Sequence, residues 1–162
     1  MVASLLSLSR FIFAFLIFYE ILYQENYYFA SFLIILASLS DFLDGFVARH
    51  FERETPVGAQ LDHISDKVFV LLVLVAFFSK SRVEPIQLSL IAFREIGITF
   101  LRFYGFAGPV NVLGKLKTVT EFLALFLLCF HPLLGNLFLW FAIFLAYISA
   151  FFYLRRPVKV QF

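Results

Sequence analysis

Long apolar runs, each ended by a short polar break, make up most of the chain. An α-helix needs about 20 apolar residues to cross a hydrocarbon core roughly 30 Å thick. Runs of comparable length cover residues 5–23, 27–51, 58–78, 86–106, 116–130 and 137–154. The pattern therefore predicts an all-α fold, an integral membrane bundle of six transmembrane helices.

The breaks between these runs contain residues that commonly interrupt helices. Pro56 ends one charged segment, Pro85 ends another, and Gly108-Pro109 follows the fourth run. Between the last two runs, the segment 131–136 contains a proline and a glycine, so we expect a short turn there.

Composition supports a membrane protein and excludes several other classes. The 162 residues are 62% hydrophobic and 20% aromatic, and only 15% are charged, unlike a soluble globular domain. The net charge of +2 is small and the basic residues of the chain are dispersed, so we expect no nucleic-acid partner. Six helices leave little chain for anything else, which predicts a single domain over residues 1–162.

The distribution of Lys and Arg predicts the orientation in the bilayer, because cytoplasmic loops carry an excess of both. Lys80 and Arg82 fall at a break on one side of the predicted bundle. The termini and the breaks on the other side hold more: Arg10, Arg49, Arg53, Lys115, Lys117, Arg155, Arg156 and Lys159. We expect a multi-pass protein of a prokaryotic plasma membrane, with both termini and residues 41–66 toward the cytoplasm.

Four carboxylates lie at helical spacing in two neighbouring runs. Asp41 and Asp44 are three residues apart, and Asp62 and Asp66 are four apart. Either spacing places a pair on one helix face. A short loop joins the two runs, so we expect antiparallel helices whose aspartate faces converge.

Four converging carboxylates repel one another unless cations or protons neutralise them. Oxygen ligands without His or Cys favour hard divalent ions, and two Mg²⁺ or Mn²⁺ ions would balance four negative charges. Gly45, Ala48 and Gly58 leave room beside these aspartates, and Arg49 offers a donor fork for phosphate. Helix packing alone also uses small residues, but it does not require four facing acids.

The whole pattern resembles the signature of the CDP-alcohol phosphatidyltransferases. It consists of Asp41-x-x-Asp44-Gly45-x-x-Ala48-Arg49, eight further residues, Gly58, and then Asp62 and Asp66 at intervals of four. The resemblance implies a six-helix membrane enzyme, usually a homodimer, that moves a phosphatidyl group from a CDP-linked lipid to an alcohol and releases CMP.

The resemblance also implies a role for each residue of the pattern. Asp41, Asp44, Asp62 and Asp66 would hold two divalent metal ions, and Asp66 would also be the general base. The residues implied around the CDP moiety are Gly45, Ala48, Arg49, Gly58 and Ser7, the last from an opening segment that resembles Asn-x-x-Thr.

The second half of the chain bears on the acceptor alcohol. Arg94-Glu95-Ile96 with Arg102, followed by Gly114-Lys115-Leu116-Lys117-Thr118, resembles the branch of the family that uses glycerol 3-phosphate. An acceptor that carries a phosphate needs cations, which Arg94, Arg102, Lys115 and Lys117 can provide. The alternative for both lysines is a cytoplasmic loop without a ligand.

Other functions remain open on the sequence. The same chemistry could use an inositol phosphate acceptor or an archaeal lipid donor in place of CDP-diacylglycerol. Intramembrane carboxylates also occur in cation transporters, although no inverted repeat is visible here. A non-catalytic assembly factor is a third possibility.

Overall fold

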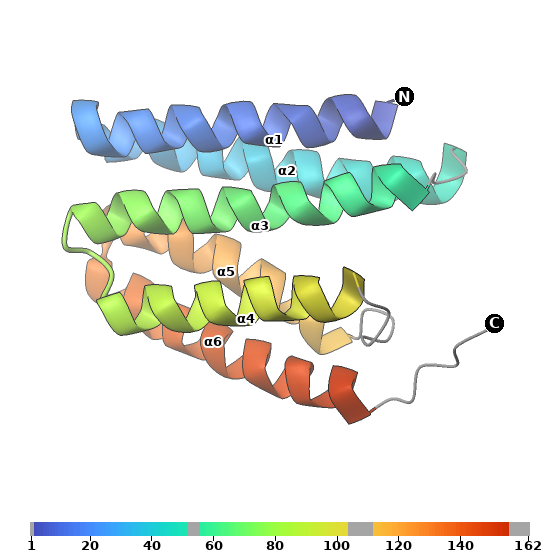
Figure 1. Cartoon of the computed structure of the whole chain (residues 1–162). Helices are drawn as coiled ribbons and strands as arrows, with labels where there is room; N and C mark the ends of the chain where they lie inside the picture. Colours follow the sequence, from blue (N-terminus) through green and yellow to red (C-terminus); the bar gives the residue numbers. More distant parts are fainter. Residues whose placement is uncertain (1, 52–55, 104–111, 156–162) are drawn as a thin grey trace. The chain divides into compact units, whose positions relative to one another are not determined.

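All regular secondary structure is helical in the part of the chain that the computed structural model describes (Figure 1). The described backbone covers residues 2–51, 56–103 and 112–155, and the described side chains cover 9–40, 64–101 and 112–152. The elements are α1 (Val2–Tyr19), the π-helix η1 (Glu20–Gln24), α2 (Tyr27–Phe51), α3 (Pro56–Ser79), α4 (Pro85–Phe103), α5 (Val112–Phe130) and α6 (Pro132–Arg155). The prediction of an all-α chain is confirmed for these residues.

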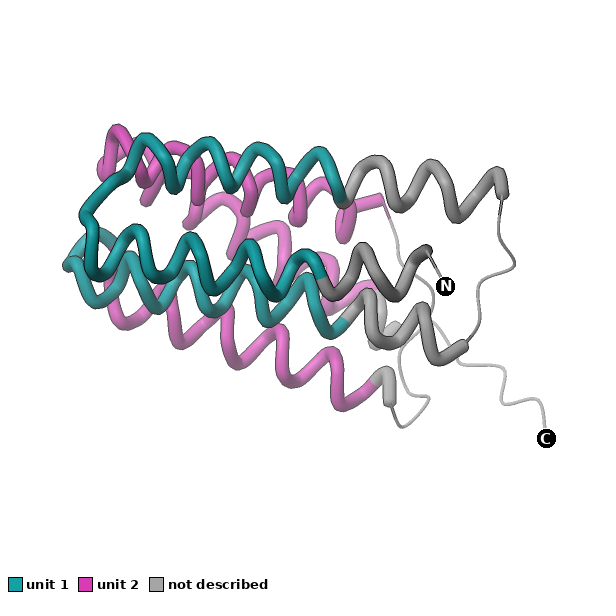
Figure 2. Tube along the Cα trace, turned by 90° about the horizontal axis from the view of Figure 1, so that it is seen from above, with its two compact units in different colours: residues 1–82 teal, residues 83–162 magenta. Residues whose placement is uncertain are grey.

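The helices form two compact units, Met1–Arg82 and Val83–Phe162 (Figure 2). In the first unit α1 packs against both α2 and α3, and in the second unit α6 packs against both α4 and α5. Each unit therefore has one helix that contacts the other two. The single domain over residues 1–162 stays a prediction.

In the first unit α1 runs parallel to α3 and antiparallel to α2 (Figure 1). Helical spacing of three or four residues places one stripe of α1 and one stripe of α2 in the interior. The stripe of α1 consists of Arg10, Ala14 and Ile17 and continues into η1 at Ile21, and that of α2 consists of Ala30, Leu33, Ile34 and Ala37. Arg10 is the charged member of these two stripes.

In the second unit the buried stripes contain charged side chains. Arg94 and Glu95 lie in the stripe of α4, and Lys117 and Glu121 lie in the stripe of α5. Most large exposed side chains on the same helices are apolar, such as Phe93, which is 76% exposed, although Lys115 of α5 is also exposed. Charge inside and apolar surface outside is the reverse of the usual arrangement in a soluble protein.

One stretch in the described part of the chain is by itself long and apolar enough to cross a membrane. It is Pro132–Phe152, with a mean hydropathy of 1.9, and Tyr27–Ser40 is apolar but shorter. The six-span bundle stays a prediction.

The break after α3 has a defined geometry that the sequence pattern did not reveal. Arg82 N–H donates to the Phe77 carbonyl at 3.0 Å and Ser81 N–H donates to the Phe78 carbonyl at 2.9 Å, with Ser81 at φ 56°. These bonds form a Schellman motif, which ends a helix on a left-handed residue.

The two basic residues at this break have partners in the same unit. Lys80 forms an ion pair with Glu25, whose pKa this ammonium lowers, and the Arg82 guanidinium lies 3.6 Å from the centroid of the Tyr27 ring. Lys80 and Arg82 lie on the side predicted to face away from the cytoplasm. Both cations therefore have partners within the first unit.

Two predicted breaks differ from the structure. The turn at 131–136 is wrong, because α6 begins at Pro132; proline suits the first position of a helix, where no N–H is needed. Gly135 lies inside α6, where a Cβ would come within 2.7 Å of the Leu128 backbone nitrogen. Helix α5 also begins earlier than predicted, at Val112, so Lys115, which precedes the predicted run, is helical like Lys117.

Candidate active site

The four aspartates of the sequence pattern lie in two helices of the first unit. Asp41 and Asp44 belong to the second half of α2, and Asp62 and Asp66 belong to the first half of α3. The helical spacing that their pairing requires is therefore present in the backbone. Among the four, only the side chain of Asp66 lies in the described part of the chain.

Asp66 forms an ion pair with Arg10 of α1. The Nη1 atom of Arg10 donates to Oδ1 of Asp66, and the two side chains keep 2% and 29% of their surfaces exposed. A buried guanidinium thus fixes one carboxylate oxygen, while the carboxylate itself stays accessible to a ligand. Arg10 was expected only to help set orientation, and this contact with Asp66 was not predicted.

A metal site can be judged here by the chemistry of its predicted donors. The described side chains contain no cluster of three or more His, Cys, Asp or Glu residues, but Asp41, Asp44 and Asp62 lie outside them. The donor set on α2 and α3 consists of carboxylates alone, which suits Mg²⁺ or Mn²⁺ rather than zinc. The residues present therefore fit the predicted ions.

The residues expected around CDP also lie outside the described side chains. Gly45, Ala48 and Arg49 follow the first aspartates in α2, Gly58 precedes the second pair in α3, and Ser7 lies in α1. Their roles stay predictions.

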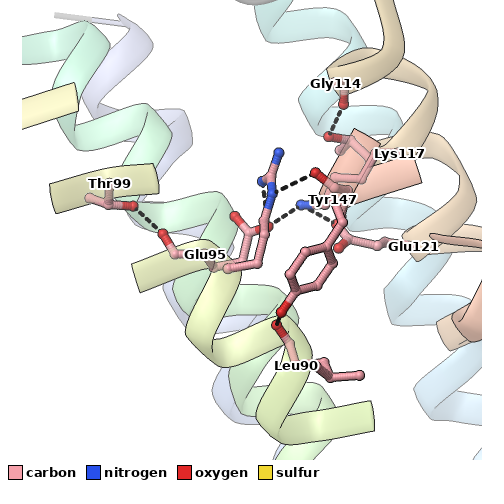
Figure 3. A network of polar contacts seen from close by, with 10 residues as sticks. Leu90, Glu95, Thr99, Gly114, Lys117, Glu121 and Tyr147 are labelled. Atoms are coloured by element: carbon pink, nitrogen blue, oxygen red, sulfur yellow. Dashed lines mark hydrogen bonds and ion pairs between the residues drawn. The ribbon is translucent and has the colours of Figure 1, made fainter. Parts of the chain in front are cut away.

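The second unit contains a buried cluster of four charged side chains, whose polar contacts Figure 3 draws. Glu95 Oε1 accepts hydrogen bonds from Arg94 Nη1 and Lys117 Nζ, each at 2.6 Å. Lys117 Nζ also lies 2.8 Å from Glu121 Oε2, one helical turn away on α5. We call Arg94, Glu95, Lys117 and Glu121 the charge cluster.

The charge cluster connects the three helices of its unit. Lys117 of α5 reaches Glu95 of α4, and Arg94 Nε donates to the Ala146 carbonyl of α6 at 3.2 Å. Each of the four side chains keeps 8% or less of its surface exposed. Buried charges of this kind need partners, and here each has at least one.

The structure thus brings together two of the four residues predicted to bind an acceptor phosphate. Arg94 and Lys117 meet at Glu95, whereas Lys115 is exposed on the first turns of α5. The side chain of Arg102 lies outside the described residues.

Neither acid of the cluster was predicted to pair with a buried cation. One signal was available: Glu95 and Glu121 both lie in apolar runs, where an ionisable residue normally has an oppositely charged partner. The identity of that partner is set by tertiary contacts across 22 residues, which spacing along one helix does not reveal.

Comparison with known proteins agrees with the sequence signature. A sequence model of the family described as CDP-alcohol phosphatidyltransferase matches residues 1–148. A protein of Aquifex aeolicus (strain VF5) is 41% identical over 130 residues, which cover 76% of this chain and 72% of that protein. One of Rickettsia bellii (strain RML369-C) is 34% identical over 140 residues, covering 78% and 77%.

A third relative, from Bacillus subtilis (strain 168), is 30% identical over 136 residues, which cover 76% of this chain and 70% of that protein. All three relatives carry the name CDP-diacylglycerol–glycerol-3-phosphate 3-phosphatidyltransferase. The match over residues 1–148 includes the helices that carry the aspartates and the charge cluster, and the chain belongs to the CDP-alcohol phosphatidyltransferase family.

Proposed function

We propose that this protein transfers a phosphatidyl group from CDP-diacylglycerol to glycerol 3-phosphate and releases CMP. The observation that carries the proposal is the complete aspartate pattern on α2 and α3, in a chain whose relatives bear the name of that activity. The buried cations of the second unit support an acceptor that carries a phosphate.

The donor would be held by residues of the first unit. Asp41, Asp44, Asp62 and Asp66 would hold two Mg²⁺ or Mn²⁺ ions. When bound, these ions would neutralise the negative charge of the diphosphate and the negative charge that develops on the phosphate oxygens during transfer. Arg49 would donate to a phosphate oxygen, and Gly45, Ala48, Gly58 and Ser7 would leave space for or contact the nucleotide.

The acceptor hydroxyl would attack the lipid-linked phosphorus. One P–O bond forms to the acceptor oxygen, the P–O bond to CMP breaks, and Asp66 receives the hydroxyl proton. The ion pair with Arg10 orients Asp66 for this task, because it restricts one carboxylate oxygen to a single position. Arg94, Lys117, Lys115 and Arg102 would bind the phosphate of the acceptor.

The protein would act as a multi-pass membrane protein, as a homodimer, with its active site toward the cytoplasm. The apolar exposed surfaces of the helices and the distribution of Lys and Arg support this placement.

An acceptor panel tests the proposal directly. The purified full chain, in detergent with CDP-diacylglycerol and Mg²⁺ or Mn²⁺, is given glycerol 3-phosphate, inositol phosphate, glycerol or serine, and CMP release is measured. We expect release with glycerol 3-phosphate. Release with another acceptor alone would overturn the assigned substrate, and cation flux in liposomes without CMP would indicate a transporter.

A further inference from the structure

The charge cluster has no net charge. Arg94 and Lys117 contribute two positive charges, and Glu95 and Glu121 contribute two negative ones. A phosphomonoester dianion gains little attraction from a neutral cluster, and both cations already have carboxylate partners. An acceptor phosphate can therefore bind these cations well only if one carboxylate gives way.

The two carboxylates are held unequally. Glu95 Oε1 accepts from two cations, Arg94 and Lys117, each at 2.6 Å. Glu121 contacts Lys117 through Oε2 alone, and its Oε1 is buried without a hydrogen-bond partner in the described part of the chain. A buried carboxylate oxygen without a donor is unfavourable. Glu121 is thus the more weakly held acid.

Glu121 also differs from Glu95 in that its pair with Lys117 lies within one helix. It is one turn from Lys117 on the same helix, so a change of its side-chain rotamer separates the pair. Glu95, in contrast, links α4 to α5 through Lys117, and its departure would release that link.

We propose that Glu121 is a specificity-determining residue whose carboxylate occupies Lys117 until the phosphate of the acceptor replaces it, while Glu95 holds Arg94 and Lys117 in place. The inference rests on the proposed function and names the acceptor class of that site. Carboxylate and phosphate oxygens accept from the same ammonium donor, so one anion can substitute for the other. A neutral alcohol such as glycerol cannot make this exchange, which favours phosphorylated acceptors.

Two isosteric variants separate the roles of the acids. Glu121→Gln and Glu95→Gln each remove one negative charge from the same cluster and keep the side-chain shape. We expect Glu121→Gln to lower the Kd for glycerol 3-phosphate about three- to tenfold, and Glu95→Gln to raise it about tenfold. Isothermal titration of the full chain in detergent micelles measures both, with inorganic phosphate and glycerol as further probes.

The probes identify the chemical group that exchanges. Inorganic phosphate should show the same order of affinities among the three proteins if the phosphate alone is recognised, and glycerol should bind no variant better than the wild type. An equal decrease of Kd in both variants would mean that net charge alone sets the affinity, and would overturn the division of roles. An unchanged or higher Kd in Glu121→Gln would overturn the exchange itself.

Kinetics and folding distinguish this inference from the proposed function. In an active wild type, Glu121→Gln should lower KM for glycerol 3-phosphate without raising KM for CDP-diacylglycerol. A wild type that releases no CMP with any acceptor contradicts the proposed function, and the binding data still decide the inference. If Glu121→Gln does not fold, Glu121→Asp serves in its place, because the shorter side chain keeps the charge but reaches Lys117 less well. The Kd of Glu121→Asp for glycerol 3-phosphate should then also be lower than that of the wild type. An unchanged Kd would overturn the proposal.

Discussion

Asp66 is the residue at which the sequence pattern and the described side chains meet. Its position four residues after Asp62 predicted a ligand and a base, and its side chain proves to be partly exposed and bound to Arg10. The spacing of the aspartates could identify Asp66, because helical periodicity depends only on positions close together in the sequence. It could not reveal Arg10 as the partner, because 56 residues separate the two and only the packing of α1 on α3 unites them.

Replacement of Asp66 tests its chemical role. Asp66→Asn should reduce CMP release by about 10²- to 10⁴-fold, because the amide can neither accept the hydroxyl proton nor contribute a negative charge to the metal ions. The amide oxygen can still accept from Arg10, so the helical circular dichroism should be retained. CMP release from purified protein measures the effect.

Glu25→Gln provides the matched control. It also removes a carboxylate that is ion-paired, but this one lies exposed beside Lys80 at a loop. Its CMP release should stay close to that of the wild type. Full activity of Asp66→Asn would show that this aspartate is not needed for transfer.

The charge cluster illustrates the same limit at a second place. Arg94 could be singled out because a charge inside an apolar run is unusual, and Lys117 because residues 114–118 resemble a segment of the family. Their pairing through one oxygen of Glu95 depends on how α4 and α5 are placed by α6, and this placement has no signature in either helix alone.

At the scale of the helices, the hydrophobic runs predict the presence of each helix better than the residues at which it begins and ends. The second run covers residues 27–51, and α2 is Tyr27–Phe51. The boundary of α6 was missed because Pro and Gly mark turns in one context and serve a helix in another. Pro132 begins α6, and Gly135 allows α6 to pack closely on α5.

Close packing at Gly135 leads to a prediction with an internal control. Gly135→Ala places a Cβ 2.7 Å from both the backbone nitrogen and Cγ of Leu128, so we expect a loss of about 1–3 kcal/mol from strain. Gly97→Ala in α4 meets no atom within 4 Å, so it should gain about 0.5–1 kcal/mol from helix propensity.

Thermal unfolding in the same detergent compares the two variants, and the midpoints should move in opposite directions. A Gly135→Ala protein as stable as the wild type would mean that α5 and α6 can separate without loss. If both variants were destabilised equally, the loss would reflect the replacement of any helical glycine by alanine and not the close contact at Gly135.

At the scale of the whole molecule, polarity is distributed as in a membrane protein. Buried stripes contain Arg10 and the charge cluster, while large apolar side chains such as Tyr28 and Leu133 are 79% and 77% exposed. Composition could predict this inversion, because a 62% hydrophobic chain has too few polar residues to cover its surface. It could not predict the division into two units, which follows from the contacts among the described helices.

Metal removal is a test of the molecule as a whole, since binding to the folded state alone raises its stability. If Asp41, Asp44, Asp62 and Asp66 hold two divalent ions, EDTA should abolish CMP release, and Mg²⁺ or Mn²⁺ should restore it. The unfolding midpoint should also rise as Mn²⁺ is added, because four carboxylates relieve their mutual repulsion through the ions.

The same titration on Asp41→Asn separates the predicted site from adventitious binding. This variant removes one ligand far along the sequence from Asp66, and its midpoint should rise less with Mn²⁺ than that of the wild type. Ions bound elsewhere on the surface would stabilise both proteins equally, and CMP release that persists in EDTA would contradict metal dependence. If Asp41→Asn shows both a smaller rise of the unfolding midpoint with Mn²⁺ and a loss of CMP release, the aspartate pattern binds the metal ions. Stability of the folded protein and activity would then support this conclusion independently.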